Sequence, residues 1–317
     1  MNFPRISIII PSFNQGVFIE STLQSIISQN YSNSELIVID GGSSDSTIEV
    51  LKKYDSFIHY WVSESDHGQS DAINKGLEKA TGEIINWLNS DDLLTENSLF
   101  DIANEFRRHN PDILCGYCDY FSSDPLFIPF RHRTVLCKDA ELTLLRGEIN
   151  QPSMFYKASI FKDLAGVNTD LNCVMDLDLF YRYLLRYGQQ KIKLSDKLFS
   201  KFRMHNASKT SSFENRFIDE RIILMNSIIS ISGLPERLQL VLKNNDCISF
   251  NYTIDKRFFN LNKCLLHIIQ EKYFDVYKKG DYVSTLVIYF KLLFSGKNVY
   301  SKSHIAVAYN SLISSIR

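Results

Sequence analysis

Residues 6–11 read ISIIIP, and residues 35–40 read ELIVID. Each is a continuous apolar run of strand length, which is typical of strands that helices cover on both faces. The segment between them, residues 17–30, places apolar side chains at helical spacing. This succession predicts two parallel strands joined by a helix, which is the start of an α/β domain.

The same alternation continues through the first hundred residues. Further strands are expected at 57–62 and 83–88, and helices at 46–54, 69–80 and in a segment that ends by Phe106. Ser46 and Glu49 have the spacing of a capping box for the helix at 46–54. The order of elements predicts a doubly wound α/β domain, in which ligands bind beyond the carboxyl ends of the strands.

The pattern becomes mixed beyond residue 111. Strands are expected near 112–121, 153–157 and 197–204, and a helix over 175–187 that ends at Gly188. After about residue 212 the chain shows mainly amphipathic helices. We therefore expect an α/β domain over residues 1–212 and a mostly helical C-terminal extension over residues 213–317.

Charge is distributed unevenly along the chain. The net charge of −1 argues against a general nucleic-acid binder, so no nucleic-acid partner is expected. Residues 1–110 hold 7 Lys and Arg against 16 Asp and Glu, a balance of −9, whereas residues 236–317 hold 12 against 6, a balance of +6. Solvated surface charge explains this pattern. So does an acidic catalytic half with a basic segment, 236–317, that contacts an anionic membrane.

The sequence offers few signs of targeting or of cysteine chemistry. The N-terminus leads directly into a strand, and no apolar stretch reaches the ~20 residues that a membrane span needs. We expect a cytoplasmic protein with at most peripheral contact at the inner face of the cell membrane. Cys115 and Cys118 form a C-x-x-C without a second such pair, and a spacing of three puts them on opposite faces of a strand. We interpret them as structural thiols.

Acidic residues follow the expected strands and begin a later helix. They are Asp40, the pair Asp91 and Asp92, and the pair Asp176 and Asp178. Neighbouring carboxylates repel one another unless a cation offsets their charge, and Mg²⁺ is bound through one or two carboxylates together with substrate phosphates. The clusters therefore indicate metal-assisted chemistry on a nucleotide-linked substrate. Turn formation at Asp40, helix capping at Asp91 and Asp92, and helix-start stabilisation at Asp176 and Asp178 explain them without a ligand.

Asp176 and Asp178 are two positions apart on one helix, so they do not share a face. Only one of them is expected to point into a cleft. His205 follows the last expected strand, with Arg203 and Lys209 nearby. A histidine flanked by cations can bind a metal or a leaving diphosphate, although a lone histidine is more often structural.

Taken together and in order, these segments resemble the inverting glycosyltransferases of family 2, which have the GT-A fold, of the kind found in bacterial polysaccharide and O-antigen biosynthesis. The likeness is carried by SIIIPSFNQGVFIESTLQSIISQNY, ELIVIDGGSSDST, SESDHGQSDAINKGLEKATGEIINWLNSDD and INQPSMFYKASIFKDLAGVNTDLNCVMDLDLFYRYL. It covers roughly the first two thirds of the chain and implies a GT-A domain, a Rossmann-like fold for binding nucleotide-sugars.

The resemblance implies roles for individual residues. Asp176 matches the general base, and Asp91 matches the final aspartate of the D-x-D motif, which holds Mn or Mg. His205, and with it Asp92, is expected at the metal. The implied substrate-binding residues are Pro11, Ser12, Asn14, Asp40, Asp66, Asn89, Gln151, Asp178, Arg203 and Lys209.

The implied reaction moves a sugar from a nucleotide-diphosphate donor to a hydroxyl of a saccharide or lipid-linked acceptor. The family pattern indicates a UDP-sugar and a hexosyl or N-acetylhexosaminyl group. Two residues depart from that pattern: Asn89 replaces the first aspartate of D-x-D, and Met175 replaces the glutamate before the base. They leave open a catalytically silent partner of a glycan-assembly complex. A sugar nucleotidylyltransferase is disfavoured because the loop PSFNQG contains no Arg or Lys.

Overall fold

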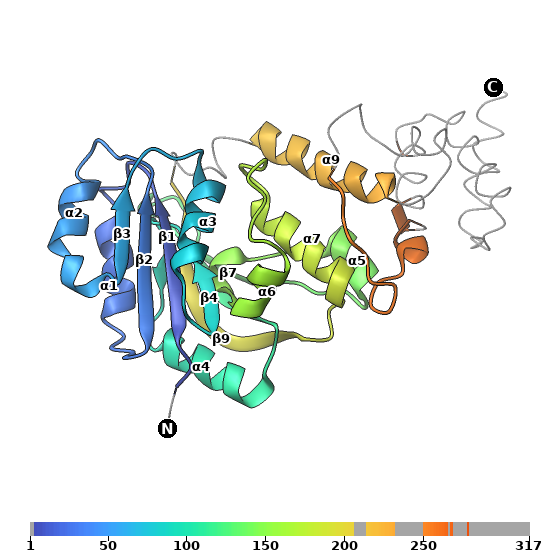
Figure 1. Ribbon diagram of the computed structural model, residues 1–317, viewed down its shortest axis with the longest axis horizontal. Coiled ribbons are helices and arrows are strands. Elements are labelled where there is room, and N and C mark those ends of the chain that lie inside the picture. The colour runs from blue at the N-terminus through green and yellow to red at the C-terminus, as the bar shows by residue number, and fades with distance from the viewer. Residues whose placement is uncertain (1–2, 206–213, 232–249, 266, 269–277, 279–317) are drawn as a thin grey trace, which may run out of the picture. The chain divides into compact units, whose positions relative to one another are not determined.

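The computed structural model describes residues 3–205, 214–231, 250–265, 267–268 and 278 (Figure 1). The chain divides into two compact units, residues 1–221 and 222–317. The boundary expected from the sequence, between residues 212 and 213, lies within a segment, 206–213, that is outside the described residues. Each unit is described by itself below.

The first unit is built on a nine-stranded sheet. Its strands are β1 (Ile6–Ser12), β2 (Ser34–Asp40), β3 (Tyr60–Ser63), β4 (Ile84–Trp87), β5 (Leu93–Leu94), β6 (Ile113–Phe121), β7 (Phe130–Arg133), β8 (Met154–Lys157) and β9 (Ile192–Arg203). The strand order is β3-β2-β1-β4-β8-β6-β9-β5, and β7 pairs with β6 at the side. The neighbouring strands β3, β2, β1 and β4 are all parallel, as the alternating sequence predicts.

Helices cover this sheet on both sides. The helices of the first unit are α1 (Ile19–Ile27), α2 (Thr47–Lys53), α3 (Gln69–Lys79), α4 (Ser98–His109), α5 (Ala140–Arg146), α6 (Ala158–Asp163) and α7 (Met175–Tyr187), with short 3₁₀ turns at Asp55–Phe57 and Gln151–Ser153. Helix α9 (Glu214–Ser230) begins in the first unit and continues into the second. Figure 1 shows α1 and α2 on one side of β1–β3 and α3 on the other. The α/β class expected from the sequence is confirmed.

The apolar runs form the core, as their pattern predicts. Every residue of β1 is buried, and Ile6, Ile8 and Ile10 belong to one apolar cluster with side chains of α1. Burying one such side chain stabilises a fold by about 1.5–3 kcal/mol. Ile9 packs against α3 on the other side of β1, where a Cβ on Gly76 would collide with it. The glycine therefore sets how closely α3 approaches the sheet.

The carboxyl ends of three strands coincide. Ser12 of β1 is in register with Asp40 of β2, and Asp40 is in register with Ser63 of β3. The Gly41 N–H donates to the Ser12 carbonyl at 2.8 Å, so the two chains separate into loops at the same height. These strand ends place the polar residues of three segments along one edge of the sheet.

The structure departs from the sequence expectations in several places, and β7, α5 and α6 are elements that the sequence did not predict. β8 is antiparallel to both β4 and β6, so the sheet is mixed beyond β4. The two-residue strand β5, which pairs with β9, was not expected. Ser46 makes no side-chain cap on α2, so the expected capping box is wrong. Asp45 takes that role instead, because its Oδ1 accepts from the Thr47 N–H at 3.0 Å while its Oδ2 accepts from Gly16.

In the second unit, Phe250 N–H donates to the Ser227 hydroxyl at 2.7 Å, and Phe259 and Leu265 are buried. Most of the basic segment 236–317, for which membrane contact was expected, lies outside the described residues. In the part of the chain that the structure describes, none of the helices has both the length and the apolar character that crossing a bilayer requires.

Cys115 and Cys118 are buried in β6, and burial raises the pKa of each thiol to about 12.

Candidate active site

The loops after β1 and β2 are joined to each other by hydrogen bonds. The Asn14 N–H donates to the Ser43 hydroxyl at 2.7 Å, and the Asn14 side chain accepts from the Ser44 N–H at 2.9 Å. Gly16 N–H donates to Asp45 at 2.9 Å. Asn14 has a left-handed backbone, with φ of 52°, a conformation that asparagine tolerates better than most residues. Asn14, an expected substrate-binding residue, therefore also fixes the two loops as one surface.

Asp40, the last residue of β2, holds the loop that follows it through hydrogen bonds. It is fully buried, and its carboxylate accepts hydrogen bonds from Gly42 N–H, Ser43 N–H, the Ser43 hydroxyl and the Ser63 hydroxyl. This is the turn-forming role that the sequence left open for it. Asp40 shapes the backbone that a nucleotide would meet, and its own oxygens are already engaged by the loop.

Three other expected substrate-binding residues lie at this edge. Pro11 is buried at the end of β1, beside Ser12. The Ser12 hydroxyl is buried and has no hydrogen-bond partner among the residues that the structure describes. Buried polar atoms almost always have a partner, so this hydroxyl is suited to a ligand. Asp66 lies against Gly41, where an added Cβ would come within 2.8 Å of its Oδ2.

Asp91 and His205 form a pair at the ends of β4 and β9. Asp91 Oδ2 lies 2.9 Å from His205 Nε2, and both side chains are mostly but not completely buried. The His205 ring packs on Phe18, with 4.6 Å between ring centroids. Arg203 holds the Asp91 backbone, since its Nε donates to the Asp91 carbonyl at 2.9 Å. The guanidinium also lies over the Phe18 ring, so the pair is fixed from two sides.

The geometry of this pair fits a divalent ion. Mg²⁺ binds its ligands at about 2.0–2.1 Å in an octahedron, so two adjacent ligands lie about 3 Å apart. The 2.9 Å separation of Asp91 Oδ2 and His205 Nε2 is that of a hydrogen bond, and it would also allow both atoms to bind one cation once the shared proton is lost. Nowhere in the described residues do three His, Cys, Asp or Glu side chains come together as a metal site. Two protein ligands with substrate phosphates is the arrangement that suits Mg²⁺ or Mn²⁺ here.

Asp92, the third residue expected at the metal, is not part of this pair. It is buried, and its Oδ1 accepts from the Arg203 N–H at 3.0 Å while its Oδ2 accepts from the Asn89 side chain at 3.3 Å. Burial, and then the charge of Asp91, raise the pKa of Asp92 well above its usual value. Helix capping does not explain either carboxylate, because α4 begins only at Ser98.

Asn89 and Gln151 each take part in a hydrogen bond near the loop that follows β4. Gln69, the first residue of α3, donates to the Asn89 side-chain oxygen at 2.7 Å. Gln151 donates to the Trp87 carbonyl, at the end of β4, at 2.6 Å. No role for Gln69 was expected from the sequence. Its place at the start of a helix, directly after Gly68, was the available signal, but it did not reveal a partner 20 residues away.

Asp176 and Asp178 have different surroundings, as their spacing predicts. Asp178 is fully buried and pairs with Arg182 at 2.8 Å, and Arg182 also donates to the Gly166 carbonyl. Asp178 was expected to bind substrate, but its buried carboxylate is used in the interior of the fold, in the pair with Arg182. Asp176 is half-buried at the start of α7, and burial raises the pKa of its carboxyl to about 6. A carboxyl with that pKa can accept a proton near neutral pH.

The loop that contains Asn89 and Asp91 and the loop that leads to Asp176 are both held by α3, since Gln69 bonds the Asn89 side chain and the Ser70 hydroxyl donates to the Leu171 carbonyl at 2.8 Å. The structure thus places Pro11, Ser12, Asn14, Asp40 and Asp66 at the ends of β1 to β3, and Asp91 and His205 at the ends of β4 and β9. Asp178 lies inside the fold, and Lys209 lies outside the described residues.

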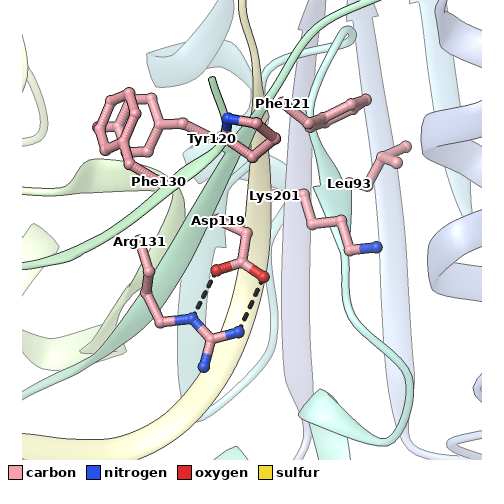
Figure 2. Close-up of a pocket in the computed structure, with 8 residues that line it drawn as sticks. Leu93, Asp119, Tyr120, Phe121, Phe130, Arg131 and Lys201 are labelled. Atoms are coloured by element: carbon pink, nitrogen blue, oxygen red, sulfur yellow. Dashed lines mark hydrogen bonds and ion pairs between the residues drawn. The ribbon is translucent and has the colours of Figure 1, made fainter. Parts of the chain in front are cut away.

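A separate pocket of about 420 Å³ opens between β5, β6, β7 and β9. Figure 2 shows Leu93, Phe121 and Lys201 on its wall, beside the Asp119 carboxylate that pairs with Arg131. The nitrogen–oxygen distances of that pair are 2.6 and 2.9 Å. None of the site residues expected from the sequence lines this pocket.

Comparison with known proteins gives the family. Residues 7–184 match glycosyl transferase family 2. The chain belongs to this family. It is a glycosyltransferase, as the resemblance in its sequence implied. An uncharacterized glycosyltransferase of Rickettsia typhi is 28% identical over 220 residues, which are 67% of this chain and 68% of that protein. This chain spans only 35–36% of the length of other, longer rickettsial relatives.

Solved structures support the GT-A fold. Staphylococcus aureus TarS in complex with UDP-GlcNAc matches with a TM-score of 0.58 at 17% identity, over 98% of this chain and 88% of that one. The mannosyltransferase PcManGT of Pyrobaculum calidifontis, in complex with GDP-Man and Mn²⁺, matches with a TM-score of 0.55 at 14% identity, over 100% and 82%. At these identities the likeness shows the fold alone.

Proposed function

We propose that this glycosyltransferase moves a hexosyl or N-acetylhexosaminyl group from a UDP-sugar, with inversion and with the help of Mn²⁺ or Mg²⁺. The observation that carries the proposal is the placement of the Asp91–His205 pair and of the loop before Asp176 around α3. A metal-binding pair and a general base, on two loops that one helix holds, are the two parts that a single displacement needs.

The donor would lie on the joined loops after β1 and β2. The unpartnered Ser12 hydroxyl and the Asp66 carboxylate supply polar contacts for a nucleoside, and Gly41 and Gly42 allow close approach of a ligand. A divalent ion held by Asp91 and His205 would offset the charge that grows on the leaving diphosphate. The binding of UDP-GlcNAc by TarS and of GDP-Man and Mn²⁺ by PcManGT supports a nucleotide-sugar donor and a metal ion for this chain. It does not decide between uridine and guanosine in the donor.

Asp176 acts as the general base. The acceptor oxygen attacks the anomeric carbon as the bond from that carbon to the diphosphate breaks, and the hydroxyl proton passes to the Asp176 carboxylate. A pKa of about 6 leaves Asp176 ionised near neutral pH and ready for that proton. Because the nucleophile enters opposite the leaving group, the configuration at the anomeric carbon inverts.

The acceptor is proposed to be a saccharide or a lipid-linked oligosaccharide in the synthesis of a bacterial surface polysaccharide. The reaction would then take place in the cytoplasm, at the inner face of the membrane. The excess of positive charge over residues 236–317 supports contact with an anionic surface. Flotation with anionic liposomes tests it: the full chain should float, whereas a chain shortened to residues 1–235 should not.

A thermal-shift screen tests the donor. UDP, GDP, UDP-GlcNAc, UDP-glucose and GDP-mannose would each be added with Mn²⁺ and with excess EDTA. A uridine ligand should raise the melting temperature only when Mn²⁺ is present, since the diphosphate completes the metal site. Stabilisation by GDP-mannose alone would contradict the uridine assignment. Stabilisation that persists in EDTA would contradict the metal.

UDP release from UDP-GlcNAc and UDP-glucose separates an active enzyme from a silent partner of a glycan-assembly complex. An active enzyme should release UDP slowly even to water, and Asp91→Asn should remove that activity. Nucleotide binding without release, by a chain that retains its fold, would favour the silent partner that Asn89 and Met175 leave open.

A further inference from the structure

Glu220 of α9 binds the backbone just before α7. Its carboxylate is buried and accepts hydrogen bonds from three consecutive N–H groups. The distances are 3.0 and 3.2 Å from Asn172 to the two oxygens, 2.8 Å from Cys173 and 3.1 Å from Val174. Glu220 and the three donors all belong to the first compact unit.

These bonds hold the backbone of the three residues that lead into α7. Val174 is the N-cap residue of α7, and its side chain cannot accept a hydrogen bond. The first N–H groups of a helix have no partner inside it, and the helix dipole favours a negative charge at this end. Hydrogen bonds from N–H groups to a carboxylate are also stronger than bonds between neutral groups. Glu220 therefore places a negative charge near the start of α7 and fixes the backbone that enters the helix, and its bonds go to the three residues before Met175.

The same loop is held at its other end by α3. The Asn74 side chain exchanges two hydrogen bonds with the backbone of Val167, each 2.9 Å long, and the Ser70 hydroxyl binds Leu171. The segment from 167 to 174 is thus fixed by α3 at one end and by α9 at the other. Asp176 follows two residues later, within the first turn of α7.

We propose that Glu220 is a positioning residue for the general base Asp176. By holding the start of α7, it fixes the place of the Asp176 carboxylate relative to the donor, and it takes no part in binding the donor itself. The proposal rests on the function proposed above, because it takes Asp176 as the base.

The surroundings of Glu220 direct its carboxylate toward the loop. Arg216, one turn earlier on α9, donates from Nε to Glu220 Oε1 at 3.1 Å. This interaction is at the surface, since the Arg216 side chain is about half exposed. Asp219 is the neighbouring carboxylate on the same helix and is exposed. It offers a matched control for the loss of a negative charge from α9.

Glu220→Gln tests the proposal. The variant keeps the size of the side chain but replaces one acceptor oxygen with an NH₂ group, which would face N–H donors. We expect kcat for UDP release from the UDP-sugar that the wild type uses, with Mn²⁺, to fall about 10²-fold, the cost of moving a reacting group by about 1 Å. KM for the UDP-sugar and the affinity for UDP should stay within about twofold. Asp219→Asn should behave as the wild type.

Hydrogen exchange measures whether Glu220 holds the backbone of residues 172–174, and the measurement does not depend on enzyme activity. In Glu220→Gln the amides of a peptide spanning residues 171–178 should exchange at least tenfold faster, while peptides of β1 and β2 keep their protection. Glu220→Asp, a shorter carboxylate, should recover part of both the protection and kcat. Recovery of this kind would support an acceptor role rather than a role in packing.

The outcomes separate the two proposals. Unchanged exchange in Glu220→Gln would overturn the inference whatever the activity, and so would faster exchange with wild-type kcat. A matching rise in the KM for the UDP-sugar would also overturn it, because Glu220 would then act on the donor or on the whole fold. If the wild type releases no UDP from any UDP-sugar, the proposed function fails, while exchange still decides whether Glu220 holds the loop.

Discussion

The carboxylate of Asp91 and the imidazole of His205, 114 residues apart in the chain, approach to 2.9 Å. The parallel pairing of β6 with β9 and the short pairing of β5 with β9 bring the end of β9 beside the loop after β4. Arg203 then fixes this contact, since its backbone N–H binds Asp92 and its side chain binds the Asp91 carbonyl. The pair is therefore a product of the sheet topology.

His205→Asn should weaken the binding of Mn²⁺. Altering even an outer partner of a metal ligand costs about 10–100-fold in affinity, so losing a direct ligand should raise the half-saturating Mn²⁺ concentration for UDP release at least as much. His132→Asn is the control, because His132 forms a similar pair with Glu148, at 2.8 Å, away from this site. An unchanged Mn²⁺ titration of His205→Asn would remove His205 from the metal site.

Asp176→Asn should abolish most of the turnover and leave donor binding intact. A positioned general base contributes about 10²–10⁴-fold, and the amide cannot accept the proton. Single-turnover transfer and UDP titration of the same preparation measure the two effects separately. The exposed Asp170, in the loop before α7, gives the control variant Asp170→Asn. Equal turnover of Asp176→Asn and the wild type would show that another group is the base.

The pH profile of kcat should show an acidic limb near pH 6. Asp176 acts as a base only when it is ionised, and burial raises its pKa from 3.8 to about 6. Activity should therefore fall as the pH decreases through about 6, and the residual activity of Asp176→Asn should lack this limb. A profile that stays flat through this range would contradict the assignment.

The same pKa shift predicts an effect on stability of known sign. The folded protein holds this proton more tightly than the unfolded chain, because the folded pKa is the higher one. The contribution of Asp176 to the free energy of unfolding is therefore present at acid pH and is lost as the pH rises through about 6. Urea unfolding of the wild type and of Asp176→Asn on both sides of that pH measures it.

Gly116→Ala should destabilise the first unit. An added Cβ at Gly116 in β6 would collide with the ring of Phe199, which is fully buried in β9. Overpacking of a core typically costs about 1–3 kcal/mol, which urea unfolding can measure. The double variant Gly116→Ala/Phe199→Leu should regain part of the loss, because the smaller side chain gives the methyl group room. A double variant less stable than both single variants would refute this account.

The sequence was sufficient wherever local pattern determines structure. The apolar runs at β1 and β2 gave both strands and the edge at which Ser12 and Asp40 meet. The spacing of Asp176 and Asp178 correctly indicated that they face different surroundings. In these cases the information lies within a few residues, where helix and strand periodicity operate.

The remainder depended on partners far apart in the chain. Glu220 and Val174 are separated by 46 residues, and no local pattern marks either of them as bonded to the other. The spacing of Ser46 and Glu49 predicted a capping box, but in the fold Asp45 lies beside Gly16 and binds the first N–H of α2 instead. Tertiary contacts decide between such local alternatives.

The two adjacent side chains at the start of α3 have a mechanical consequence. Gln69 is tied to the loop that would hold the metal, and Ser70 is tied to the loop that leads to the base. Any rotation or shift of α3 would therefore carry both loops together. The spacing between the loop that carries Asp91 and the loop that leads to Asp176 is therefore set through a single helix.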